Sequence, residues 1–517
     1  MVSCAQCNNS ARCGPWTLPA RHGTKAGTRG LCATARQLSH HTQRSALTQD
    51  NSPAGPSRVR WFPGTSDAST VRSMNEQTAR SPFRRPLLMG GVSAAALMFL
   101  VLPGMYFALS SSQLDEKLEA LRSQGLPTSA EELNAYYSVL PDGADATEQW
   151  ITATTAVQDA GIGQRAAKIP IVGLGPTPVP DPGNEWAERE ISRTFLDGLD
   201  AELQLIRRAA DAGGMARYPV DYKAGVNADL TAQHQVRVIA RLLTLSAHVH
   251  AHSGRDSETL QDVTDICSAS DSLRSDPGLI SQFVRIATHA IGCEMTADML
   301  PHCQWTDDEL ERLQAALGRA DFRQGMLRAF CGERALCLTA FRTSPQILFR
   351  YDSALKVLEM YQESTAGLET SWLEATMRNQ KIDAELRAMS SGIISRMIQG
   401  SLRQMLPALQ QAVNAGTRAE ARQNCAIVTI AVRRYRLQHG VLPISMTDLR
   451  DLIPGDAAEK DARVIDPFDG QSLRFRSADG RVLIYSIGDN KVDDGGAIAN
   501  EKPQQGDLGY SIADDSE

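Results

Sequence analysis

Three histidines at alternate positions, His248, His250 and His252, form the most suggestive metal-binding pattern in the sequence. On a helix, His248 and His252 would share one face because they lie one turn apart, whereas His250 would point elsewhere. Two imidazoles at this spacing can bind zinc, but a zinc site needs a third ligand, and the H-E-x-x-H arrangement of zinc hydrolases is absent. We therefore interpret the three histidines as the polar end of a helix that stops before Gly254.

A second group of chemically capable side chains lies near the C-terminus. Residues 489–496, with the sequence DNKVDDGG, offer carboxylate and amide oxygens on a loop bounded by glycine. Calcium takes six to eight oxygen ligands, so a loop of this composition can supply a calcium site, although its spacing does not match the twelve-residue EF-hand loop. A solvated acidic turn without any ion is the alternative interpretation.

No sequence motif assembles a catalytic centre. The nucleophile motif G-x-S-x-G, the phosphate-binding motif G-x-x-x-x-G-K-[ST] and the dinucleotide motif G-x-G-x-x-G are all absent. We assign no catalytic residue, expect no cofactor other than calcium, and leave open whether the chain is an enzyme. The six cysteines beyond residue 110 are expected to be buried free thiols, with a Cys293–Cys303 disulfide as an alternative.

The charges divide the 517-residue chain into three parts. Residues 1–85 hold twelve Lys or Arg against three Asp or Glu, residues 87–109 hold no charge, and the remainder has a net charge of -16. This distribution, with an aromatic content of only 5%, argues against a nucleic-acid partner.

The uncharged segment, residues 87–109, is long enough to span a membrane, since about 20 apolar residues cross the hydrocarbon core. Arginines precede it and acidic residues follow it, which predicts a cytoplasmic N-terminus and an extracytoplasmic body at the inner (cytoplasmic) membrane. A cleaved signal peptide is the rival interpretation, but its apolar region is normally shorter. Residues 74–86 would be a short basic cytoplasmic lead. Residues 1–73 would be a disordered head or an over-extended reading frame that precedes a true start at Met74.

The hydrophobic periodicity predicts a mostly α fold of stacked helical hairpins, solenoid-like, with a small α+β domain at the C-terminus. We expect a helical juxtamembrane region over residues 112–168, a proline-rich loop over residues 169–183, and a helical body over residues 184–412. Within that body, one long helix is expected over residues 185–212, and Thr306 with Glu309 forms a capping box.

The last hundred residues have a different pattern. A helix over residues 418–438 is followed by two strand-like runs, residues 472–476 and 481–487. Asp479-Gly480 lies between the runs, and Asp-Gly at this place is a strong signal for a β-hairpin. A last short run over residues 507–512 could add an edge strand.

These C-terminal features, in this order, resemble the type II secretion pseudopilin G family over residues 413–513. The resemblance is carried by a helix that ends in Tyr435-x-x-x-x-Gly440-x-x-Pro443, then Asp466-Pro467-Phe468-x-Gly470, the hairpin, and Tyr485-Ser486-x-Gly488 with an acidic tail. In that family the loop after the hairpin often binds calcium. The matching positions, Ser486, Asp489, Asn490, Asp493 and Asp494, are therefore the expected metal ligands.

The chain departs from pseudopilins because its expected anchor lies some 300 residues upstream and lacks their processing site, so we do not expect a pilus subunit. The whole layout joins the expected anchor, the segment GLPTSAEEL (residues 125–133), a helical middle with LISQFVRIA (residues 279–287) and this ending. Over nearly all of residues 87–513 it is similar to large membrane-anchored proteins of planctomycete-type bacteria, a resemblance that implies no activity. We expect a single-pass, membrane-anchored extracytoplasmic scaffold or interaction protein of the bacterial envelope, with protein partners there and with secretion as one setting. An envelope hydrolase whose site is built from dispersed residues is the alternative.

Overall fold

The computed structural model describes residues 85–139, 143–343, 350–388, 393–500, 502 and 505–513. For residues 85–100, 103, 226, 350 and 393–405 it describes the backbone alone. The expected head over residues 1–73 and nearly all of the basic lead lie outside this description. Contacts divide the chain between Pro103 and Gly104, and the elements below belong to the unit that continues to the C-terminus, except for the first part of α1.

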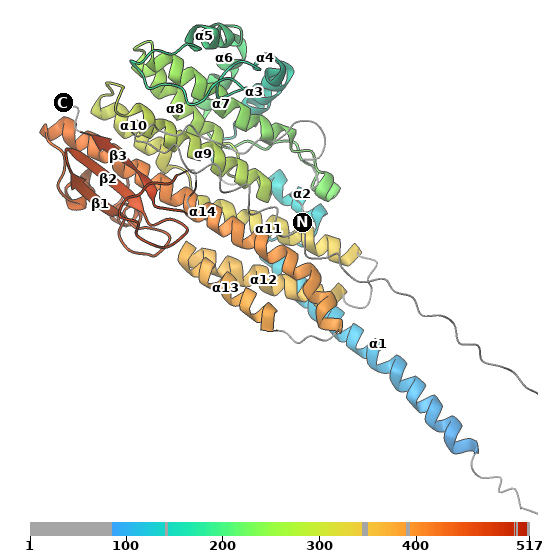
Figure 1. Cartoon of the computed structure of the whole chain (residues 1–517). Helices are drawn as coiled ribbons and strands as arrows, with labels where there is room; N and C mark the ends of the chain where they lie inside the picture. The colour runs from blue at the N-terminus through green and yellow to red at the C-terminus, as the bar shows by residue number, and fades with distance from the viewer. Residues whose placement is uncertain are drawn as a thin grey trace, which may run out of the picture. The chain divides into compact units, whose positions relative to one another are not determined.

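The described chain is mostly helical, as the sequence predicts, and carries one small sheet near its C-terminus (Figure 1). The first elements are α1 (Arg85–Ser123), α2 (Ala130–Ser138), α3 (Thr147–Asp159), α4 (Ile162–Arg165), α5 (Arg189–Asp197), α6 (Asp200–Ala212) and the 3-10 helix η1 (Tyr222–Asn227). The central helices are α7 (Thr231–Ala251), α8 (Asp256–Asp271), α9 (Leu279–Met299), α10 (Asp307–Gly318), α11 (Phe322–Thr343), α12 (Arg350–Thr370) and α13 (Trp372–Ala388).

Local sequence signals account for several of these boundaries. Thr306 caps α10, and its capping box with Glu309 is present in full, which confirms that prediction. The proline-rich loop contains no helix or strand. The prediction of a single helix over residues 185–212 is wrong, because α5 ends at Asp197 and α6 begins at Asp200. The break places Leu199 in the core, where it is completely buried.

The expected membrane span, residues 87–109, lies within α1 in its backbone, but the side chains of residues 87–100 and 103 lie outside the description. Over the residues that could be searched, no helix combines the length and the apolar character needed to cross a membrane.

The C-terminal part is built on α14 (Ile393–His439), a helix of 47 residues. It is followed by the 3-10 helix η3 (Met446–Leu452), α15 (Ala457–Arg463), β1 (Arg474–Ala478), β2 (Arg481–Ser486) and β3 (Leu508–Ala513). The three strands form an antiparallel sheet in the order β1-β2-β3. Asp479 and Gly480 form the turn of the β1–β2 hairpin with positive φ angles of 53° and 68°, which confirms the hairpin.

The small sheet and the helical body share one hydrophobic core. β2 and β3 pack on α14, and α14 also packs on α9, α10 and α13 (Figure 1). Buried side chains of a single cluster come from both parts, for example Ile266 of α8, Ile427 of α14 and Ile484 of β2. The domain boundary expected between residues 412 and 413 falls inside α14, which runs from Ile393 to His439.

Candidate functional site

The five residues predicted to bind calcium lie at the end of β2 and in the loop that follows it. Ser486 is the last residue of β2 and is buried, and its hydroxyl donates a hydrogen bond to Asp466 Oδ1 at 2.8 Å. The loop then returns along the sheet and leads into β3. The residue that organises this region is Asp466, which belongs to the Asp466-Pro467-Phe468 motif but is not among the five expected ligands.

Asp466 is completely buried and accepts four hydrogen bonds. Its donors are the backbone N–H groups of Phe468 at 3.0 Å and Ile487 at 2.9 Å, the Ser486 hydroxyl at 2.8 Å and Arg474 Nη1 at 3.1 Å. Burial raises the pKa of the Asp466 carboxyl, while the hydrogen bonds oppose that shift. Asp466 thus holds the Asp-Pro-Phe turn against the end of β2, and a motif of this kind before a hairpin is the signal that could have identified it.

Asp489 points away from the rest of the loop toward α14. Its Oδ2 lies 3.2 Å from Arg418 Nε, and its side chain is 10% exposed. Its Oδ1 is buried and has no hydrogen-bond partner. Burial raises the pKa of the Asp489 carboxyl, and the charge of Arg418 lowers it. Asp489 also lines a cavity of about 30 Å³, together with Thr376, Asn414, Thr417, Pro467, Phe468 and Lys491. A cavity of this size holds a single water molecule.

The other predicted ligands take partners within the loop. Asn490 Nδ2 donates to Asp494 Oδ2 at 2.7 Å. Asp493 Oδ1 accepts from the Tyr485 hydroxyl at 3.1 Å and from the Gly495 N–H at 2.9 Å. The structure thus brings Asn490 and Asp494 together, but it directs Ser486, Asp489 and Asp493 to three different neighbours. Calcium binding at these residues stays a prediction.

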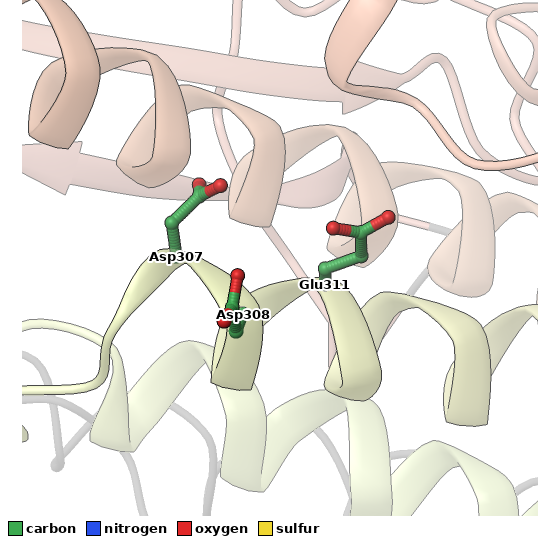
Figure 2. A group of neighbouring side chains, drawn as sticks. All are labelled: Asp307, Asp308 and Glu311. Carbon is green, nitrogen blue, oxygen red and sulfur yellow. The ribbon is translucent and has the colours of Figure 1, made fainter.

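Among the residues that the structure describes, one group of three acidic, histidine or cysteine side chains brings its ligand atoms within 4.8 Å of one another: Asp307, Asp308 and Glu311. All three project from the start of α10 (Figure 2). Arg434 of α14 lies 2.8 Å from Asp307 Oδ1 and 3.1 Å from Glu311 Oε2. The hydrogen bonds from Arg434 lower the pKa of Asp307. Asp307 and Glu311 therefore form ion pairs with Arg434 that join α10 to α14.

The three histidines lie at the C-terminal end of α7, as expected, but His248 and His250 are buried. Both His248 and His252 pack against the ring of Trp186, which confirms that they share a face. His252 Nε2 lies 2.9 Å from the Pro180 carbonyl oxygen. Burial lowers the pKa of His248 to about 4, so its imidazole is neutral at physiological pH.

His250 belongs to a buried polar cluster between α6, α7 and α8 that the sequence did not reveal. Its Nδ1 lies 2.8 Å from Asp262 Oδ2, and Arg207 Nη2 lies 3.5 Å from Asp262 Oδ1. Asp265, one turn further along α8, accepts a hydrogen bond from Gln261 through Oδ1, whereas its buried Oδ2 has no partner. Burial raises the pKa of Asp265 to about 8.

A second buried carboxylate, Asp276, connects the turn after α8 to η1, to α7 and to the start of α9. It accepts hydrogen bonds from the Tyr222 hydroxyl at 2.6 Å, from Gln233 Nε2 at 3.2 Å and from the Gly278 N–H at 2.8 Å. Burial raises the pKa of Asp276, and these hydrogen bonds oppose the shift. Because its donors come from η1, α7 and the start of α9, Asp276 acts as a structural anchor.

The six cysteines beyond residue 110 are all free, and four of them, Cys267, Cys293, Cys303 and Cys425, are buried. Burial raises the pKa of Cys303 to about 12, which leaves its thiol protonated and unreactive.

In comparisons with known proteins, no protein-family model, no curated protein and no solved structure matches the chain.

Proposed function

We propose that this chain is a membrane-anchored extracytoplasmic interaction protein of the bacterial envelope. One observation carries the proposal: large apolar side chains are exposed along the described end of the expected span. They are 46–59% exposed and comprise Val101, Leu102, Met105, Tyr106 and Leu109. A cluster of this kind on one helix is unfavourable in water and marks a surface that lipid or a partner covers.

The sequence on both sides of these residues supports a lipid environment. The uncharged segment of 23 residues would extend about 34 Å as a helix, compared with roughly 30 Å for the hydrocarbon core. Arg84 and Arg85 precede it, and Asp115 and Glu116 follow it. The positive residues favour the cytoplasmic side, so the body that follows the span would lie outside the cytoplasm.

The body itself supports a role in binding other proteins. The pairs α7–α8, α8–α9, α11–α12 and α12–α13 pack as consecutive neighbours, and we interpret them as stacked, solenoid-like hairpins that offer extended surfaces to partners. The pairing of a long helix, α14, with a three-stranded antiparallel sheet supports the resemblance to pseudopilin G. Secretion-like machinery is therefore one setting in which to seek those partners.

Charges placed in the span test the anchor. In the variant Met98→Arg/Leu102→Arg we expect the full chain to leave the membrane fraction after alkaline carbonate extraction, because each arginine near the centre of a span costs about 2.5–3.5 kcal/mol of insertion free energy. The matched control is Val139→Arg/Met377→Arg, which adds the same charge at two exposed apolar residues of the body. We expect this control to remain in the membrane.

Fusion reporters then test the orientation. A C-terminal alkaline phosphatase should be active, and a C-terminal fluorescent protein that matures only in the cytoplasm should be dark. The proposal is overturned if the double arginine variant extracts like the wild type, or if the reporters show the opposite orientation.

We further propose that calcium braces the C-terminal loop of this protein. The support is the buried Asp489 Oδ1, which has no hydrogen-bond partner, on a loop that also carries the carboxylates of Asp493 and Asp494. Calcium bound at Asp489 Oδ1, with the loop carboxylates turned toward it, would stabilise only the folded state.

Thermal unfolding of the full chain in detergent, with and without calcium, measures this stabilisation. At a calcium concentration 100 times the dissociation constant, we expect about 2.7 kcal/mol of added stability. The variant Asp489→Asn/Asp493→Asn should lose the shift, and Asp479→Asn, in the exposed hairpin turn, should keep it. A wild type whose unfolding temperature does not respond to calcium would end this part of the proposal.

A further inference from the structure

The end of the expected span can be located along α1. About 20 residues of helix fill a hydrocarbon core of roughly 30 Å. Counted from Leu87, the twentieth residue is Tyr106 and the next is Phe107. Tyrosine and tryptophan are enriched at the level of the lipid headgroups, where an apolar ring and a polar tip are both satisfied. Tyr106 is therefore suited in type and position to the outer edge of the hydrocarbon core.

This end of the span packs against the first turn of α12. The Tyr106 hydroxyl donates a hydrogen bond to Asp352 Oδ1 at 2.8 Å, and the Ser110 hydroxyl reaches the same oxygen at 3.3 Å. The ring of Phe107 packs edge-on against the ring of Tyr351, with centroids 4.8 Å apart. All five contacting residues belong to the unit that begins at Gly104.

Apolar packing continues this contact along α1. Leu114 and Leu118 are buried against Leu338 of α11 and against Ala354 and Leu358 of α12. Between Gly104 and Ser123, α1 is therefore a packed element of the body and not a free tether. The residues of α12 that touch Tyr106 and Phe107 must lie at nearly the same depth as these two residues.

We propose that the first turn of α12, with Tyr351 at its centre, contacts lipid in the headgroup region of the inner membrane, on its extracytoplasmic side. This inference rests on the proposed function and adds to it a second lipid-contacting element, because Asp352 lies 246 residues after Tyr106 in the sequence. We expect lipid to cover this surface because Tyr351 packs beside Phe107, a residue of the span itself. The apolar side chains of Met105 and Leu109 are also exposed on α1.

A photo-crosslinking amino acid tests the depth of Tyr351 directly. p-Benzoylphenylalanine replaces Tyr351 in the full chain, which is reconstituted into phosphatidylcholine–phosphatidylglycerol vesicles and irradiated, and phospholipid adducts are counted by mass spectrometry. Leu109, within the span, serves as the positive position, and Met377, exposed on α13, as the negative one. We expect adducts at position 351 to exceed those at position 377 by about tenfold, since the probe reacts only with groups in contact with it.

A second variant separates contact from general folding. Asp352→Ala removes the acceptor shared by Tyr106 and Ser110, so we expect adducts at position 351 to fall at least twofold while those at position 109 persist. Carbonate extraction of the same vesicles identifies which proposal fails. If the protein is integrated but positions 351 and 377 react equally, lipid contact at α12 is refuted and the anchor stands. If the protein is extracted, both proposals are refuted.

Discussion

Replacement of Asp466 by alanine is expected to lower the free energy of unfolding by about 3–5 kcal/mol, the range found when one partner of a buried ion pair is removed. The carboxylate is completely buried and accepts hydrogen bonds from Phe468, Ile487, Ser486 and Arg474. Alanine would remove the acceptor of the Phe468 and Ile487 N–H groups and of the Ser486 hydroxyl, and each unsatisfied buried group costs about 1–3 kcal/mol. Arg474 would keep Asp469 and the Ser472 carbonyl oxygen as acceptors. Chemical denaturation of the full chain in detergent measures the loss.

Asp469→Ala is the matched control, because Asp469 also contacts Arg474 but is only partly buried. We expect it to cost about 1 kcal/mol or less, as is usual for ion pairs near the surface. Equal losses in Asp466→Ala and Asp469→Ala would show that Arg474 alone, and not the convergence of four donors on Asp466, stabilises this end of the sheet.

Replacement of Asp265 by asparagine is expected to raise the free energy of unfolding, and the gain should grow with pH. Asp265 is 1% exposed, and its Oδ2 has no hydrogen-bond partner. The groups that act on it are Gln261, which donates to Oδ1, the like charges of Asp262 and Asp211, and the opposite charge of Arg207. Asparagine keeps the acceptor for Gln261 and removes the group that would otherwise ionise.

The pH window follows from the pKa of Asp265, which burial raises from 3.8 to about 8. Below pH 4 the carboxyl is protonated in both folded and unfolded chains, so its favourable contribution to stability is fully present. Between pH 4 and pH 8 the unfolded chain loses this proton while the folded chain keeps it, and stability falls by up to about 1.4 kcal/mol per pH unit. Above pH 8 the effect is constant.

Unfolding of wild type and Asp265→Asn at pH 4, 6 and 8 measures this dependence. We expect nearly equal stability at pH 4 and an advantage of several kcal/mol for the variant at pH 8. The control Asp159→Asn changes an exposed carboxylate at the end of α3 and should differ from wild type equally at all three pH values. An Asp265→Asn curve that runs parallel to the wild type would contradict the assignment of a neutral, buried acid.

The parts of the fold that the sequence predicts correctly are formed by interactions between residues close together in the chain. The capping box at Thr306 and the Asp479-Gly480 turn act within four residues, so the sequence alone identifies them. The extent of α14 was missed because the prediction followed only the apolar pattern after residue 418, whereas the helix begins at Ile393. From Leu406 onward, buried residues of α14 share a hydrophobic cluster with α12 and α13, and contacts of that kind cannot be predicted from periodicity.

The candidate site shows the same limit. Asp466 was visible as a motif residue, but its role depends on Ser486 and Ile487, about 20 residues away in the sequence. The histidines were recognised by their spacing, yet the burial of His248 and the pairing of His250 with Asp262 depend on helices that pack from elsewhere. Spacing along one element indicates which side chains share a face, but not what covers that face.

The length of α14 couples the unfolding of the sheet to that of the helical body. A helix of 47 residues extends about 70 Å, and this one contributes side chains to the helical body along one part and to the sheet along another. Loosening the C-terminal strands therefore exposes part of the core beneath α9 and α10 as well. The two regions should unfold in one cooperative transition and be degraded together, so a destabilising change anywhere along α14 should lower the stability of both.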